Sequence, residues 1–277
     1  MLSLTNLINL FYCYYLYARN GLLTVINDRA LFFTDFVMGT LSPFIIQLIL
    51  WNAVFSNQKA TVPNFTFDDI IYYYAFALLL ARLNNGYDVI KYLSTNIREG
   101  TLDVWLIKPS SYIKQRLFTF LGESLLYALP IIILHLIRSI SSITDNNINL
   151  SILSGLGSLI IILILSQLLS FLLSFTLALL SFWVIEYNIL LSFSFVSSAL
   201  LGGTLLPPSL WPNWLIPIMT YNPYHFTISA PAQYFTTYDS AILIHFLIGS
   251  LFYINILYLL ICFFWSKGLK TYNSAGG

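Results

Sequence analysis

Apolar residues run continuously through long stretches of this chain instead of alternating with polar ones. Between Leu159 and Leu165, for example, no polar residue interrupts the run. A helix of about 20 apolar residues crosses the roughly 30 Å hydrocarbon layer of a bilayer, whereas the strands of a membrane barrel alternate in polarity. The pattern therefore predicts an all-α integral membrane protein, with residues 1–277 forming one domain.

Six apolar stretches have polar boundaries, and we expect each to be a transmembrane helix. A further stretch, about residues 4–26, mixes Leu, Tyr and Phe with Asn, Ser and Arg19, which favours a helix lying in the headgroup layer. A seventh span is the alternative for that stretch. The six expected spans cover approximately residues 30–55, 70–89, 117–137, 152–184, 189–203 and 241–265.

The segment from about residue 204 to 239 differs in character from the spans. Six prolines prevent one continuous helix there, and its Trp and Tyr residues are typical of a membrane interface. We expect short broken helices that dip partly into the outer leaflet. The residues that we interpret as an outer gate are Gly202, Gly203, Pro207, Pro208, Trp211 and Trp214.

Composition and charge narrow the possible classes of protein. Of the 277 residues, 58% are hydrophobic and 8% are charged, which is too little charge for a water-facing surface, and a net charge of +1 gives no case for nucleic acid. Short loops rich in Lys and Arg stay in the cytosol. With both termini cytosolic, nine of the twelve basic residues lie inside: Arg19, Arg29, Lys91, Arg98, Lys108, Lys114, Arg116, Lys267 and Lys270.

No catalytic or metal-binding motif is visible in the sequence. A chain that hydrolysed ATP would need a Gly-rich phosphate loop followed by Lys and Ser or Thr, and the three histidines have no metal-ligand spacing. A membrane-embedded lipid-modifying enzyme would show clustered Asp, Glu or His at a membrane face. That class and a non-transporting scaffold subunit stay open as alternatives.

Four sequence motifs follow the order of the spans. Ile97 to Pro109 reads Ile-Arg-x-Gly-x-Leu-Asp-x-x-Leu-x-x-Pro, Phe182-Trp183 ends the fourth span, Gly202 begins a Gly- and Pro-rich turn, and the chain ends in Gly268-x-x-x-Tyr272-x-x-x-Gly276. Together they resemble the ABC-2-type permeases, which are membrane-spanning subunits of ATP-binding-cassette exporters.

The resemblance implies a homodimer or heterodimer of permeases in the bacterial cytoplasmic membrane, in contact with membrane lipids. It also implies a separate ATPase subunit that carries ATP and Mg²⁺, with no cofactor in this chain, and export of a hydrophobic or amphipathic solute. The segment of about residues 88–116 would then couple the two subunits. By analogy, its docking residues are Asn96, Ile97, Arg98, Glu99, Gly100, Leu102, Asp103, Val104, Trp105, Leu106 and Pro109.

Two ionisable residues fall at matching depth in the expected second and third spans. Isolated charges are costly about 10 Å inside a bilayer, so we hypothesise that Arg82 pairs with Glu123. The alternative is that Arg82 extends to the headgroups while Glu123 faces a wet cavity or is protonated. Asp35, near the start of the first span, points either into a central pathway or toward the membrane interface.

Overall fold

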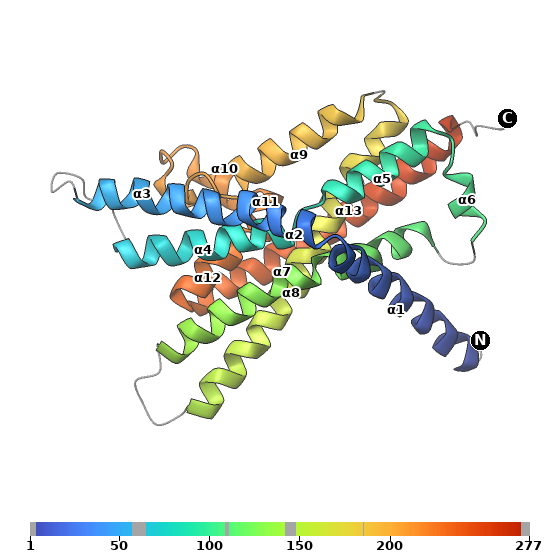
Figure 1. Cartoon of the computed structure of the whole chain (residues 1–277). Coiled ribbons are helices and arrows are strands. Elements are labelled where there is room, and N and C mark those ends of the chain that lie inside the picture. The colour runs from blue at the N-terminus through green and yellow to red at the C-terminus, as the bar shows by residue number, and fades with distance from the viewer. Residues whose placement is uncertain (1–3, 57–64, 109–110, 142–147, 185, 273–277) are drawn as a thin grey trace.

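The computed structural model describes residues 4–56, 65–108, 111–141, 148–184 and 186–272, and within these ranges every regular element is a helix (Figure 1). The longest helices pack lengthwise, with α8 at the centre of the bundle. Large apolar side chains of α8 such as Phe171 and Phe175 are fully buried. The long helices are α1 (Leu4–Asn27), α7 (Tyr112–Ser141), α8 (Ile148–Leu179) and α13 (Ser240–Thr271).

Four helical segments are long and apolar enough to cross a membrane: Arg29–Ser56, Tyr112–Ser139, Gly155–Phe182 and Ser240–Thr271. They coincide with the expected first, third, fourth and sixth spans. The helices at the other two expected spans are shorter, at 17 residues for α4 (Phe67–Leu83) and 15 for α9 (Tyr187–Leu201). Six spans therefore stay a prediction, whereas the all-helical membrane fold is confirmed.

The first candidate span contains a π-helical turn. It runs through α2 (Arg29–Phe36), η1 (Val37–Leu41) and α3 (Ser42–Ser56), and the Ser42 N–H bonds to the Val37 carbonyl. Pro43 follows directly and lacks an N–H, so the helix cannot keep its regular ladder at that position. A π-turn of this kind interrupts an α-helix at a single place and is frequent at functional sites.

α4 ends earlier than the sequence predicted. Thr66 caps its start and exchanges hydrogen bonds with Asp69. The helix then stops at Leu83, so the expected span of residues 70–89 is wrong at its end. Asn84 turns the chain: its side chain donates to the Thr227 carbonyl (2.9 Å) and its carbonyl accepts from Ser170 (2.5 Å).

The remaining short elements lie at the two ends of the bundle. Figure 1 places α6 and the end of α13 at one end, and α10, α12 and the end of α3 at the other. The interrupted segment after α9 forms several short helices, as the prolines predicted. These elements are α5 (Tyr87–Arg98), α6 (Asp103–Leu106), η2 (Leu180–Phe182), η3 (Pro208–Leu210), α10 (Ile216–Tyr221), α11 (Pro223–Thr227) and α12 (Ser229–Thr237).

Candidate functional site

The segment between α5 and α7 turns sharply at Gly100. Gly100 has φ +66°, and the Thr101 N–H bonds back to the Asn96 carbonyl (3.0 Å) while the Gly100 N–H bonds to Ile97 (3.4 Å). This pair of bonds is a Schellman motif, which ends a helix at a residue in the left-handed region. The bend at Gly100 directs α6 away from α5.

Asn96 and Tyr112 fasten this turn to the bundle. The Asn96 amide donates to the Tyr112 hydroxyl (3.1 Å) and accepts a bond from the Thr101 hydroxyl (3.3 Å). Tyr112 is 3% exposed and stacks on Trp265 of α13 at 6.1 Å between ring centroids. The turn is thus held by side chains from three separate helices.

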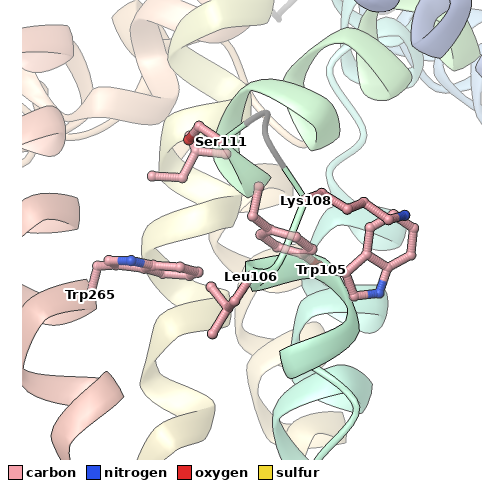
Figure 2. Close-up of a pocket in the computed structure, with 7 residues that line it drawn as sticks. Trp105, Leu106, Lys108, Ser111 and Trp265 are labelled. Carbon is pink, nitrogen blue, oxygen red and sulfur yellow. The ribbon is translucent and has the colours of Figure 1, made fainter.

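A hollow of about 310 Å³ opens beside α6 (Figure 2). Trp105 lies edge-on to Tyr112, with 6.0 Å between ring centroids, and the Lys108 ammonium sits 3.6 Å from the centre of the Trp105 ring. This cation–π contact covers the face of the indole. The hollow is lined by Trp105, Leu106, Lys108, Ser111, Tyr112, Ile113 and Trp265.

α6 presents an apolar surface outward. Val104 is 57% exposed, Leu106 40% and Ile107 84%, the highest exposure among the large hydrophobic side chains described. Exposed apolar residues on a short helix with a polar surround are typical of a protein contact. Arg98 and Glu99 lie at its edge and are also exposed, and the Arg98 guanidinium is 5.6 Å from the centre of the Tyr187 ring.

Two of the expected docking residues lie elsewhere. Leu102 is 0% exposed and Ile97 8%, so both pack inside the bundle and hold the segment instead of contacting a partner. The expectation that Leu102 contributes to the docking surface is therefore wrong in this conformation. Pro109 lies outside the described residues.

Three of the four sequence motifs meet behind this segment. The Tyr272 hydroxyl accepts a hydrogen bond from the Leu102 N–H (3.1 Å), and its ring lies edge-on to Phe182 at 6.4 Å. Gly268 is the reason that Phe182 fits, because a Cβ at Gly268 would overlap the Phe182 ring. The end of α13 and the exit of α8 therefore position the turn before α6.

Asp88 and Lys91 are exposed near the start of α5, and Arg116 of α7 is half-buried. Partial desolvation of the Asp88 carboxyl raises its pKa above its ordinary value, and the positive charges of Arg116 and Lys91 act in the opposite direction. The Arg116 guanidinium lies 4.5 Å from the centre of the Tyr92 ring. These contacts attach the first turn of α5 to the start of α7.

The fourth motif lies at the opposite end of the bundle, where α4 holds it. Gly203 has φ +81°, and its carbonyl accepts a bond from the buried Tyr73 hydroxyl (2.9 Å), while Tyr74 donates to the Leu205 carbonyl (3.1 Å). Gly202, Pro207 and Pro208 are buried around this anchor. Of the other expected outer-gate residues, Trp211 is half-buried and Trp214 is 73% exposed.

Arg82 has a different partner from the one that the sequence suggested. It forms an ion pair with Asp35 of α2, and Asp35 also accepts a bond from the Tyr127 hydroxyl (2.8 Å). Within the described part of the chain, no ion pair joins Arg82 to Glu123. Asp35 of α2, and not Glu123, is therefore the counter-ion of Arg82 in the structure.

Comparison with known proteins gives one match. A model of the ABC-2 family of transporter proteins matches residues 41–276. The chain belongs to this family. No curated protein and no solved structure matches it.

Membership of this family agrees with the long apolar helices of the structure. ABC-2 membrane proteins are typically non-catalytic transmembrane subunits, and this ABC-2 protein has several candidate membrane-spanning helices. Within the described residues, no group of three or more His, Cys, Asp or Glu is placed to hold a metal ion.

Sequence reasoning missed Ile107, Tyr112 and Tyr272 as parts of the site. Ile107 could have been predicted as part of the docking surface, because it is an apolar residue directly before a Lys-Pro pair in a polar segment. Tyr272 was part of a motif, but its contact with Leu102 joins residues 170 positions apart. A single sequence gives no signal for such a contact.

Proposed function

We propose that this ABC-2 protein is the membrane-spanning permease subunit of an ATP-binding-cassette exporter. It has six spans, with α4 and α9 completing the four long ones, and both termini on the cytosolic side of a bacterial cytoplasmic membrane. Two permeases, identical or related, pack together. ATP and Mg²⁺ bind to separate ATPase subunits, and the solute that passes is hydrophobic or amphipathic.

The exposed apolar surface of α6 is the observation that carries this proposal. On the proposed topology α6 lies in the cytosol, where no lipid covers Val104, Leu106 and Ile107. A partner protein that covers them removes apolar area from water at about 25 cal/mol per Å². Force applied to α6 reaches the spans through Trp105 and Tyr112, and through the Tyr272 contact with Leu102.

Substitution of Ile107 tests the docking surface directly. Ile107→Ser removes an anchor without disturbing the bundle, so binding of a co-expressed ATP-binding-cassette subunit should weaken roughly tenfold, as for a buried apolar contact. Co-purification and partner-stimulated ATP hydrolysis measure the effect. Trp105→Ala is less decisive, because Trp105 also packs on Tyr112 and its loss disturbs the turn.

Leu205→Ser is the matched control, since Leu205 is 57% exposed and lies in the Gly- and Pro-rich turn at the opposite end of the bundle. This variant should retain the partner at the level of the unaltered chain. Normal retention and normal hydrolysis in Ile107→Ser would remove α6 from the docking surface.

A further inference from the structure

The ion pair of Arg82 and Asp35 is open on one side only. Asp35 keeps 36% of its side-chain surface exposed, whereas Arg82 keeps 16%. Arg82 is enclosed because its side chain lies against Gly39, where a Cβ would come within 3.0 Å of the Arg82 Cδ, Nε and Cζ atoms. Its Cζ atom also lies 5.8 Å from the centre of the Tyr127 ring. The part of the pair that another molecule can reach is therefore the carboxylate.

Aromatic rings border this carboxylate. Phe32 lies three residues before Asp35 and four residues before Phe36, so it is one helical turn from each of them on the surface of α2. The Phe32 ring lies 5.0 Å from the Tyr127 ring and 6.3 Å from the Phe36 ring, measured between centroids. A carboxylate beside aromatic faces is the arrangement that attracts organic cations.

Apolar surface continues from this cluster along α2. Leu31 lies four residues before Asp35, on the same side of α2, and is 67% exposed. An apolar body can thus lie on α2 while its charged group reaches Asp35. A pair with a purely structural role has no need of an open carboxylate, and ionisable groups inside a membrane protein usually mark a solute pathway.

We propose that Asp35, Phe32, Phe36 and Tyr127 form a binding site for the positively charged headgroup of a lipophilic cation, such as an amine or a quaternary ammonium. The inference rests on the proposed transport function, because a site at this position meets a solute in transit only in a permease. Asp35 lies about 10 Å along the first span from its cytosolic start, at 1.5 Å per residue. The site thus faces the inner half of the bilayer, from which an exported solute is taken up.

Binding there changes the environment of the π-helical turn. The incoming cation competes with Arg82 for Asp35, and Arg82 is the side chain that lies against Gly39 in η1. Release of Arg82 removes one of the contacts between Val37–Leu41 and α4. Occupancy of the site is in this way linked to the position of the first span relative to α4.

Tetraphenylphosphonium tests the site without any partner subunit. The purified chain in nanodiscs of zwitterionic lipid should bind this cation saturably, after subtraction of binding to empty nanodiscs. Tetraphenylborate has the same size and shape but a negative charge, and it should not compete. Asp35→Asn should weaken binding by at least about tenfold, because it removes the opposite charge in a site of low dielectric.

Two further variants keep the result independent of folding. Asp35→Asn/Arg82→Gln leaves no unpaired charge and should bind as weakly as Asp35→Asn. Arg82→Gln alone frees the carboxylate and should bind about threefold tighter or more. Asp28→Asn is the matched control, since Asp28 caps α2 through Leu31 N–H at 3.1 Å, Asn caps equally well, and binding should not change.

Absence of saturable binding would overturn the site, and so would equal binding by the unaltered chain and Asp35→Asn/Arg82→Gln. Weaker binding of the cation by Arg82→Gln would show that it does not compete with Arg82 for Asp35, and would overturn the proposal as well. Co-purification of the ATPase is measured in parallel with the same variants. If only the cation site is wrong, the ATPase still co-purifies with the unaltered chain. If the proposed function is wrong, the ATPase does not co-purify with the unaltered chain.

Discussion

Gly21 and Gly122 set the distance between α1 and α7. A Cβ at Gly21 would lie within 3.0 Å of the Thr119 carbonyl oxygen, and one at Gly122 would overlap the Ala18 carbonyl. The two backbones therefore approach more closely than any pair of larger residues permits. Small residues at such crossings allow helices to pack by van der Waals contact in a membrane, where apolar burial gives little.

Gly122→Ala should separate the two helices. The added methyl group meets backbone atoms, which cannot move aside, so we expect a loss of about 1–3 kcal/mol of stability. A lower thermal midpoint in detergent and faster proteolysis of α1 measure the change. Gly157→Ala is the control, because a Cβ there has nothing within 4 Å. Equal midpoints for the two variants would show that α1 does not depend on this crossing.

Single residues were predictable from the sequence where local chemistry decides their role. Gly100 ends a helix because it reaches a positive φ, and Asp69 closes a capping box; both follow from neighbours within five positions. The need of Arg82 for a counter-ion was also foreseeable. Its partner was not, because Asp35 and Glu123 are both carboxylates at suitable depth, and only the packing of α2 against α4 and α7 selects Asp35.

At the scale of elements, α13 does more than cross the membrane. Its end carries Tyr272, whose hydroxyl satisfies the Leu102 N–H, and Gly268, which receives the Phe182 ring. The C-terminal end of the last span thus supports the turn that presents α6. If α6 moves relative to α13, either the hydrogen bond between the Leu102 N–H and the Tyr272 hydroxyl breaks or Tyr272 moves with the turn.

Tyr272→Phe should loosen the turn before α6. The ring contact with Phe182 remains, but the Leu102 N–H loses its acceptor, at a cost of about 1–3 kcal/mol. Hydrogen exchange at residues 99–106 should accelerate, and the stimulation of the partner's ATP hydrolysis should fall. Tyr258→Phe, which removes an exposed hydroxyl on the same helix, serves as the control. Unchanged exchange in Tyr272→Phe would show that the hydrogen bond does not hold the turn.

Helix positions were predictable from the continuous apolar stretches, but the end of α4 and the π-turn in the first span were not. From the sequence we predicted that the second span continues to residue 89, although Asn84-Asn85-Gly86 is a turn signal. The break is stabilised from a distance, by Ser170 and the Thr227 carbonyl, and Gly86 is pressed against Ser174. The π-turn at Val37–Leu41 was equally hidden, since Pro43 predicts a kink but not its type.

For the whole molecule, the number of spans decides which surfaces share a side of the membrane. α4 and α9 are shorter than the roughly 20 residues that cross a bilayer at right angles. Short helices cross where the bilayer thins or where neighbours extend the apolar length. With six spans, α6 and the turn after α9 lie on opposite sides. With only the four long spans, they lie on the same side.

Three serine-to-cysteine variants distinguish these arrangements. Ser56, Ser111 and Ser209 are all exposed, and each replacement is nearly isosteric. On a background of Cys13→Ser and Cys262→Ser, a membrane-impermeant maleimide added to intact cells should label positions 56 and 209 but not 111. Permeabilised cells should show label at all three, which controls for reactivity. Three crossings separate 111 from 209 if α9 spans, and one separates 56 from 111 if α4 does. Labelling of position 111 alone in intact cells would show that the orientation is the reverse of the proposed one. Equal labelling of positions 111 and 209 would show that α9 does not cross the membrane.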